Sequence, residues 1–216
     1  MNRNQIIQNP QISKYSLYFL IIIYTVGALG FIFQYQYDLL LSLTPLNLSL
    51  SLGFLLFFHH SFNKNFILWA SFIFLAGWLL EWVGVKTGFP FGEYEYGKTL
   101  GWAIDGIPLM MGVNWLVLIY CNHIIAHKIN KNPYFIALFT AVSMTIMDYF
   151  LEPVAVKHQF WTWYGADVPI SNYAGWFVYA FILALSSHWF KIEIKNPIAI
   201  GLLIIQFLFF IVLALF

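Results

Sequence analysis

The stretch YSLYFLIIIYTVGALGFIFQ, residues 15–34, decides the fold class of this chain. It carries no charged side chain, and it matches the roughly 20 apolar residues that an α-helix needs to cross a bilayer core. Residues 1–14 before it are polar. The run is longer than a signal-peptide core and no small-residue cleavage site follows it, so we expect a retained first membrane helix.

Further apolar runs of similar length follow along the whole chain. They predict membrane spans at residues 39–58, 66–85, 107–126, 134–152, 174–190 and 197–216. The run at 39–58 is the most polar, with small side chains of the kind found at helix–helix contacts. Of the 216 residues, 61% are apolar and 9% are charged, against about 25% charged in soluble domains. The sequence therefore predicts an all-α polytopic membrane protein, with about seven transmembrane helices in one bundle and a single domain over residues 1–216.

The basic residues predict how this bundle is oriented. More of them lie on the amino-terminal side (Arg3, Lys14, Lys64, Lys128, Lys131, Lys191, Lys195) than on the opposite side (Lys86, Lys98, Lys157). Because cytoplasmic loops carry an excess of Lys and Arg, we expect a multi-pass cell-membrane protein with a cytoplasmic amino terminus and a carboxyl terminus outside. All the acids except Glu193 fall in the non-cytoplasmic half.

Several functional classes are disfavoured by what the chain contains. The single cysteine, Cys121, excludes an internal disulfide framework and a multi-cysteine metal site. The net charge of +1 gives no reason to expect a nucleic-acid partner. His123 and His127 have a ligand-like spacing but lie at the cytoplasmic end of their span, so we interpret them as interfacial and expect no metal site. The last span has no lysine for a Schiff base, which excludes a retinal protein.

Two long connections on the acidic side are rich in aromatic residues. They cover residues 86–108 and 160–176, and glycine and proline interrupt both, so neither is expected to be continuous helix. Within the first connection, alternation in Glu93-Tyr94-Glu95-Tyr96 predicts a short strand with both tyrosines on one face. We expect these segments to form an aromatic lid over the bundle, although an interfacial aromatic belt is an alternative for any single ring.

Three carboxylates lie inside the predicted spans. Asp148 and Glu152 are four residues apart and so share one helix face, and Pro153 is expected to end that helix. Glu81 lies near the end of the third span, between two tryptophans. An ionisable group in a span costs a few kcal/mol and is a functional candidate, unless it lies shallow enough to reach water. Acids gathered in apolar surroundings suit general acid catalysis.

These residues carry a resemblance that extends over about residues 70–180. The matching strings are EWVGVKTGFPFGEYEY at 81–96, Gly106-Ile107-Pro108 with Trp115, Met147-Asp148 with Glu152-Pro153, Trp161-Thr162-Trp163, and Asn172 with Gly175-Trp176. Together they resemble the bacterial and archaeal carotenoid biosynthesis proteins, a group of membrane carotenoid hydratases. The resemblance implies addition of water across the terminal C1–C2 double bond of an acyclic carotenoid, with no metal, nucleotide or redox cofactor. It implies a carotenoid substrate, the lipid bilayer and other carotenoid-pathway enzymes as partners.

Hydration of this kind needs an acid that protonates carbon, π-faces beside the resulting tertiary cation, and a second carboxylate for water. Our hypothesis is that Asp148 or Glu81 donates the proton, while Glu152 or Asp105 positions the water. The expected substrate-binding residues are Trp82, Phe89, Phe91, Tyr94, Tyr96, Trp102, Asn114, Trp115, Trp161, Trp163, Asn172 and Trp176. A carotenoid cyclase that forms the same cation, and a non-catalytic carotenoid- or lipid-binding membrane protein, are the two alternatives.

Overall fold

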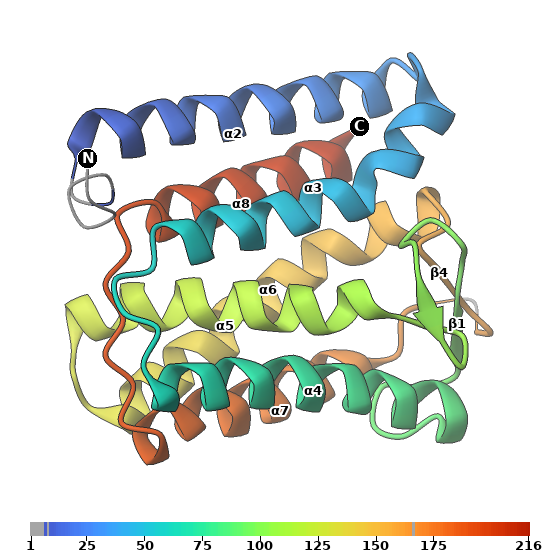
Figure 1. The fold of residues 1–216 in the computed structure, drawn as a ribbon. Helices are drawn as coiled ribbons and strands as arrows, with labels where there is room; N and C mark the ends of the chain where they lie inside the picture. The colour runs from blue at the N-terminus through green and yellow to red at the C-terminus, as the bar shows by residue number, and fades with distance from the viewer. Residues whose placement is uncertain (1–6, 8, 166) are drawn as a thin grey trace.

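The computed structural model describes residue 7 and residues 9–165 and 167–216, and within them the chain forms an antiparallel bundle of seven long helices (Figure 1). Arg3, which contributes to the predicted orientation, lies outside the described residues. The helices are α2 (Pro10–Ile32), α3 (Tyr37–Phe57), α4 (Lys64–Thr87), α5 (Leu109–Ile129), α6 (Pro133–Lys157), α7 (Ile170–Trp189) and α8 (Ala199–Leu215).

Local sequence signals explain where several helices begin and end. Asn9, Asn63 and Asn132 cap α2, α4 and α6, each accepting a hydrogen bond from a backbone N–H of the first turn. Proline occupies the first helical position after two of these caps. At the other end of α4, Gly88 ends the helix with a φ of 72°, a conformation that glycine adopts without a side-chain clash.

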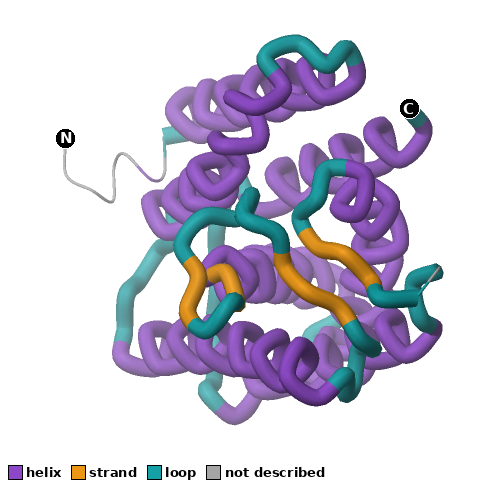
Figure 2. The backbone as a smooth tube through the Cα atoms, turned by 90° about the vertical axis from the view of Figure 1, so that its right-hand side faces the viewer, coloured by secondary structure: helices purple, strands orange, loops and turns teal. Residues whose placement is uncertain are grey.

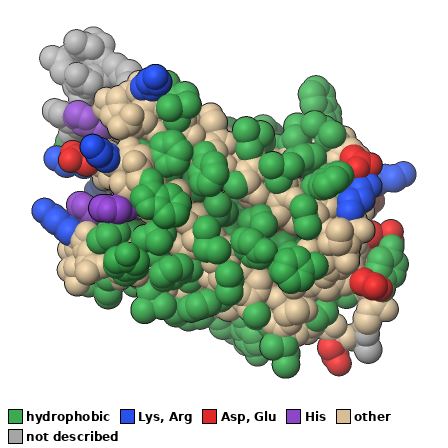
Figure 3. Space-filling model, turned by 90° about the horizontal axis from the view of Figure 1, so that it is seen from below, with side chains coloured by type: hydrophobic (Ala, Val, Ile, Leu, Met, Phe, Trp, Pro, Cys, Tyr) green, Lys and Arg blue, Asp and Glu red, His purple; other side chains and the backbone are tan. Residues whose placement is uncertain are grey.

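The lengths and surfaces of the helices are those of a membrane bundle. Among the described residues, six helices are long and apolar enough to cross a bilayer, and α8 is shorter at 17 residues. Figure 3 shows one face of the molecule covered by hydrophobic side chains, with charged side chains gathered at its two ends. The prediction of an all-α polytopic membrane protein is therefore confirmed. Helix α5 is the central element, and most of its side chains are buried by α3, α4, α6 and α8.

The prediction that Pro153 ends its helix is wrong. Helix α6 continues to Lys157, with Pro153 inside it. A proline in a helix removes one backbone hydrogen bond, but the turn that follows is buried. Val154 and Ala155 are almost fully buried, and Val154 packs with Phe31 of α2 and Leu213 of α8. This burial offsets the lost bond.

Short strands cover one end of the bundle, which we call the lid end. Strand β1 (Tyr94–Tyr96) pairs antiparallel with β4 (Trp161–Trp163), and β2 (Ala103–Ile104) pairs with β3 (Ile107–Pro108). Figure 2 looks onto this end and shows the strands lying across the ends of the helices. The two connections predicted to be irregular thus form the lid, which places its side chains above α4, α6 and α7.

Candidate functional site

The β1–β4 ribbon aims its aromatic side chains into the bundle. Tyr94 pairs with Trp163 and Tyr96 pairs with Trp161, so these rings share one face because side chains alternate along a strand. Tyr94 and Trp161 are buried, whereas Glu95 on the opposite face is exposed. The predicted alternation of tyrosine and glutamate is confirmed. Its consequence is that phenol and indole groups reach the helix ends from above.

Glu81 of α4 receives hydrogen bonds from two of these side chains and from one tryptophan of α5. The Tyr94 and Tyr96 hydroxyls each donate to Glu81 Oε2 at 2.7 Å, and Trp115 Nε1 of α5 donates to Oε1 at 2.9 Å. Glu81 itself is 3% exposed. A buried carboxyl oxygen without a partner costs about 1–3 kcal/mol or more, and these three bonds remove that cost, so the side chain can lie this deep.

The Tyr94 and Tyr96 hydroxyls, which donate to Glu81, remain protonated at ordinary pH. Burial, with the Glu81 carboxylate as the second cause, raises the pKa of Tyr94 and of Tyr96 well above its usual value. Each therefore keeps a proton that it can donate to Glu81, and Trp115 can only donate because an indole N–H is not an acceptor.

Glu152 and Asp148 of α6 form the second part of the site. Trp161 Nε1 and Trp163 Nε1 donate to Glu152 Oε2 at 3.0 and 2.8 Å. Asn172 of α7 donates to both carboxylates, at 2.7 Å to Asp148 Oδ2 and 3.0 Å to Glu152 Oε1. The second oxygen of Asp148 has no hydrogen-bond partner among the described residues, although the side chain is fully buried.

Glu81 and Glu152 line the same small cavity beneath the ribbon, which we call the inner cavity. The free space in it is about 10 Å³, which is room for about one water molecule. Its wall is completed by Tyr94, Tyr96, Trp161, Trp163, Asn172, Trp176 and Met111. Asp148 does not line it and connects with it through Asn172. The cavity therefore brings together two carboxylates and several π-faces in a place that water in bulk does not reach.

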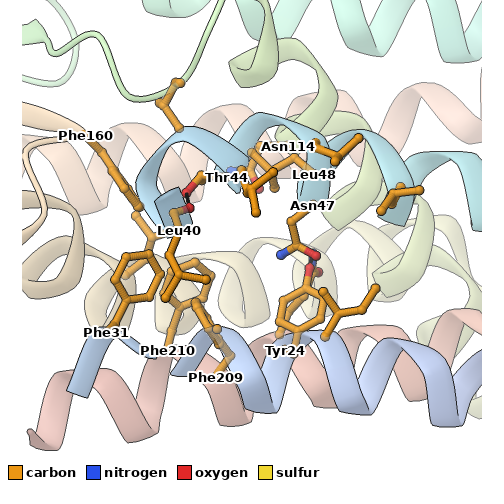
Figure 4. A pocket seen from close by; sticks show the side chains of 18 of the residues that line it. Tyr24, Phe31, Leu40, Thr44, Asn47, Leu48, Asn114, Phe160, Phe209 and Phe210 are labelled. Atoms are coloured by element: carbon orange, nitrogen blue, oxygen red, sulfur yellow. Dashed lines mark hydrogen bonds between the residues drawn. The ribbon is translucent and has the colours of Figure 1, made fainter. Parts of the chain in front are cut away.

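A second, larger space adjoins the inner cavity on the side of α2, α3 and α8. This apolar groove has a volume of about 230 Å³ and shares Met111 and Trp161 with the inner cavity. Figure 4 shows Phe31, Phe209 and Phe210 on one side of it, with Leu40, Leu48 and Asn114 among the other lining residues. Its lining includes the exposed Val26, Leu43 and Leu46, so the groove opens on the outer, lipid-facing side between α2 and α3.

A comparison with known protein families matches residues 37–216 of this chain to the carotenoid biosynthesis protein family. The chain belongs to this family. It therefore has a role in carotenoid modification, and the matched region contains all three buried carboxylates.

A curated relative is more specific but more distant. The bisanhydrobacterioruberin hydratase of Haloarcula japonica is 34% identical over 112 residues, which cover 45% of this chain and 36% of that protein. The alignment thus spans about a third of the relative's length. No solved structure matches this chain.

Within this family framework, the structure brings most of the expected site residues together. Trp115 and Trp176 stack with ring centroids 4.6 Å apart, beside the inner cavity. Phe91 is buried and contacts Tyr94 edge-on, and Asn114 lines the apolar groove.

Other predicted residues lie apart from this group. Asp105 is on the surface, where it forms an ion pair with Lys86 at 2.9 Å and accepts a hydrogen bond from Trp82 Nε1 at 2.8 Å. Lys86 and then Trp82 lower the pKa of the Asp105 carboxyl. Trp102 and Phe89 are 88% and 66% exposed. The structure therefore does not bring these four side chains, Asp105, Trp82, Trp102 and Phe89, to the inner cavity.

His123 is 3% exposed and packs against Trp69 and His127. Its predicted position at the membrane interface stays a prediction. The central helix α5 is covered on all sides, which buries even its polar positions. Among the described residues, no group of three His, Cys, Asp or Glu side chains could hold a metal ion.

Sequence reasoning missed the groove residues of the outer helices. Tyr24, Asn47 and Gln206 line the groove from α2, α3 and α8. The Tyr24 hydroxyl is hydrogen-bonded to Ser51 Oγ at 3.0 Å and accepts from Gln206 Nε2 at 3.1 Å. One signal could have found them, because polar amides inside apolar spans mark bundle-facing positions.

Proposed function

We propose that this protein is a carotenoid hydratase that adds water across the terminal C1–C2 double bond of an acyclic carotenoid end group. The observation that carries the proposal is the inner cavity, where Glu81 and Glu152 face one enclosed space. The relative from Haloarcula japonica, named as a hydratase, supports the same reaction class.

The first step is transfer of a proton to carbon. Glu81 is the proposed donor because it lines the inner cavity, whereas Asp148 lies behind Asn172. The O–H bond of the Glu81 carboxyl breaks, and the π electrons of the alkene form the new C–H bond. This leaves a tertiary cation at C1 and an ionised Glu81, which the Tyr94 and Tyr96 hydroxyls and the Trp115 indole stabilise through the hydrogen bonds described above.

The cation is stabilised by the aromatic wall until water attacks. Trp161, Trp163 and Trp176 line the cavity, and a desolvated cation over such a ring gains about 2 kcal/mol. A water molecule then forms the C–O bond and gives its proton to Glu152, so that one water has been added. Asp148 has a positioning role, because it shares Asn172 with Glu152 and fixes how that amide is oriented.

The apolar groove is the proposed binding site for the body of the carotenoid. A long hydrocarbon chain suits its aromatic and aliphatic lining, and the groove ends at Trp161 and Met111, which it shares with the inner cavity. A substrate entering from lipid between α2 and α3 would therefore present its terminal double bond to the carboxylates.

The test is expression in a lycopene-accumulating bacterial host, followed by mass analysis of the extracted pigment. We expect a gain of one or two waters, which is lost in Glu152→Gln. A new pigment of unchanged mass would indicate a cyclase instead. Unmodified lycopene in cells that contain the folded protein, together with no hydration of longer acyclic carotenoids, would contradict the proposal.

A further inference from the structure

A third space lies on the opposite side of Glu152 from the inner cavity. We call it the outer cleft. It is formed by α6, α7, the end of α8 and the segment around β4, and its volume is about 650 Å³. Its polar lining consists of Tyr149, Glu152, Lys157, Thr162, Asp167 and Tyr173. The cleft runs along α6 from Tyr149 to Lys157, which is about 12 Å at 1.5 Å per residue.

The chemistry of the outer cleft differs from that of the apolar groove. Three of its residues carry a charge at neutral pH in their ordinary forms, namely Glu152, Lys157 and Asp167. The residues that line the groove include no Asp, Glu, Lys, Arg or His. Because charged and hydroxyl groups stay solvated wherever they can, the cleft suits water whereas the groove suits hydrocarbon.

The outer cleft and the inner cavity are separated by a thin partition. Glu152 and Trp163 line both spaces, and the bond from Trp163 Nε1 to Glu152 Oε2, 2.8 Å long, joins them. Glu152 is only 1% exposed, so the partition is closed in this structure. The apolar groove therefore meets the inner cavity at Trp161, and the outer cleft meets it at Trp163.

We infer that water reaches the reaction centre through the outer cleft, crossing at the Glu152–Trp163 partition, while the carotenoid enters separately through the apolar groove. This inference rests on the proposed hydratase function. Water that crosses the partition meets Glu152 first, and Glu152 accepts the proton that the water loses when its oxygen bonds to the cation. The proton then returns from Glu152 to Glu81 across the cavity that both line, which restores the starting state.

The first experiment measures water in the cleft without using activity. In a Cys121→Ala background, Tyr149→Cys places a thiol in the cleft wall, and Ile146→Cys places one on the exposed surface of the same helix outside the cleft lining. The two positions are three residues apart, about 4.5 Å in depth, and both are exposed, at 62% and 47%. We expect a charged thiol reagent, added to both faces of membrane fragments, to label Tyr149→Cys at least about tenfold faster.

The second experiment narrows the cleft and measures hydration. Val156 lines the cleft and Val142 does not, although both lie on α6 and both are 43% exposed. We expect Val156→Trp to lower kcat for hydration by roughly tenfold or more with an unchanged KM for the carotenoid, because the substrate groove is untouched. Val142→Trp should hydrate at the rate of the unsubstituted protein.

The outcomes separate the route from the proposed function. Faster labelling of Tyr149→Cys together with slow hydration in Val156→Trp supports the route. Equal labelling of the two cysteines, or full kcat in Val156→Trp, overturns the route and leaves the hydratase intact. If the unsubstituted protein hydrates no carotenoid, the proposed function fails and the route fails with it, whatever the labelling shows.

Discussion

Glu81→Gln is the substitution that tests the acid chemistry most sharply. Glu81 accepts two phenol hydrogen bonds at Oε2 and one indole bond at Oε1. In the variant, the amide oxygen can face Trp115, and the amide NH₂ can face Tyr94 and Tyr96, whose hydroxyls can rotate to accept. The side chain therefore keeps its shape and its place but has no proton that it can give to carbon.

The expected loss of activity is much larger than the expected loss of stability. A general acid contributes about 10²–10⁴ in rate, which is roughly 3–5.5 kcal/mol of transition-state stabilisation. The proposed donor is protonated and neutral before it reacts, so the amide makes neutral hydrogen bonds of similar strength, each about 0.5–1.5 kcal/mol. The variant should thus still fold, and its kcat should fall by at least a hundredfold.

The assay is hydration of an acyclic carotenoid by purified protein in lipid nanodiscs, with product quantified by chromatography and mass. Glu95→Gln is the matched control, since Glu95 is on the exposed face of β1 and bonds only Tyr164 among the described residues. It should retain full activity. A folded Glu81→Gln variant with unchanged kcat would refute the assignment of Glu81 as the proton donor.

Three further predictions concern the support of the site and its pH dependence. Asn172→Leu removes the donor that both α6 carboxylates share and should lower the melting temperature in detergent strongly, by the equivalent of about 3 kcal/mol or more; an unchanged melting temperature would contradict the shared bond. Gly77→Ala would place a Cβ 2.5 Å from Trp115 and should cost about 1–3 kcal/mol and reduce hydration, whereas Gly53→Ala, with no atom within 4 Å, should do neither. Burial lowers the pKa of His158 to about 4, against about 6.5 unfolded. The unfolded chain thus binds more protons between these pH values, and the free energy of unfolding should fall by at most about 3 kcal/mol as the pH drops from 6.5 to 4. Thermal melts over this pH range should show a smaller fall in a His158→Asn variant. An equal fall in the variant would refute the assignment to His158.

The bundle could be predicted from sequence because a bilayer imposes a fixed length on each apolar run. The same constraint does not fix helix ends, and α6 extends beyond Pro153 because tertiary burial of Val154 outweighs a local rule. The convergence of Glu81 with Glu152 was also predictable, since ionisable groups inside spans face the bundle interior.

The rest of the site depends on contacts that a local pattern does not contain. The alternation at Tyr94 and Tyr96 predicts a strand, but its pairing with β4 joins residues about 65 positions apart. Asp105 was a candidate for positioning water because it follows the predicted lid strand in the sequence. In the structure it lies at the surface instead, where it forms an ion pair with Lys86. The apolar lining of the groove could not be predicted, because an apolar side chain that faces a groove and one that faces lipid follow the same sequence pattern.

The most direct test of the central claim is the source of the oxygen in the product. Purified protein in nanodiscs would be given an acyclic carotenoid in water enriched in the heavy oxygen isotope, under air. We predict a product heavier by one labelled water for each end that reacts, formed by the unsubstituted protein and absent with Glu152→Gln. A product without the label, a pigment of unchanged mass, or full labelling with Glu152→Gln would contradict hydration at this pair of carboxylates.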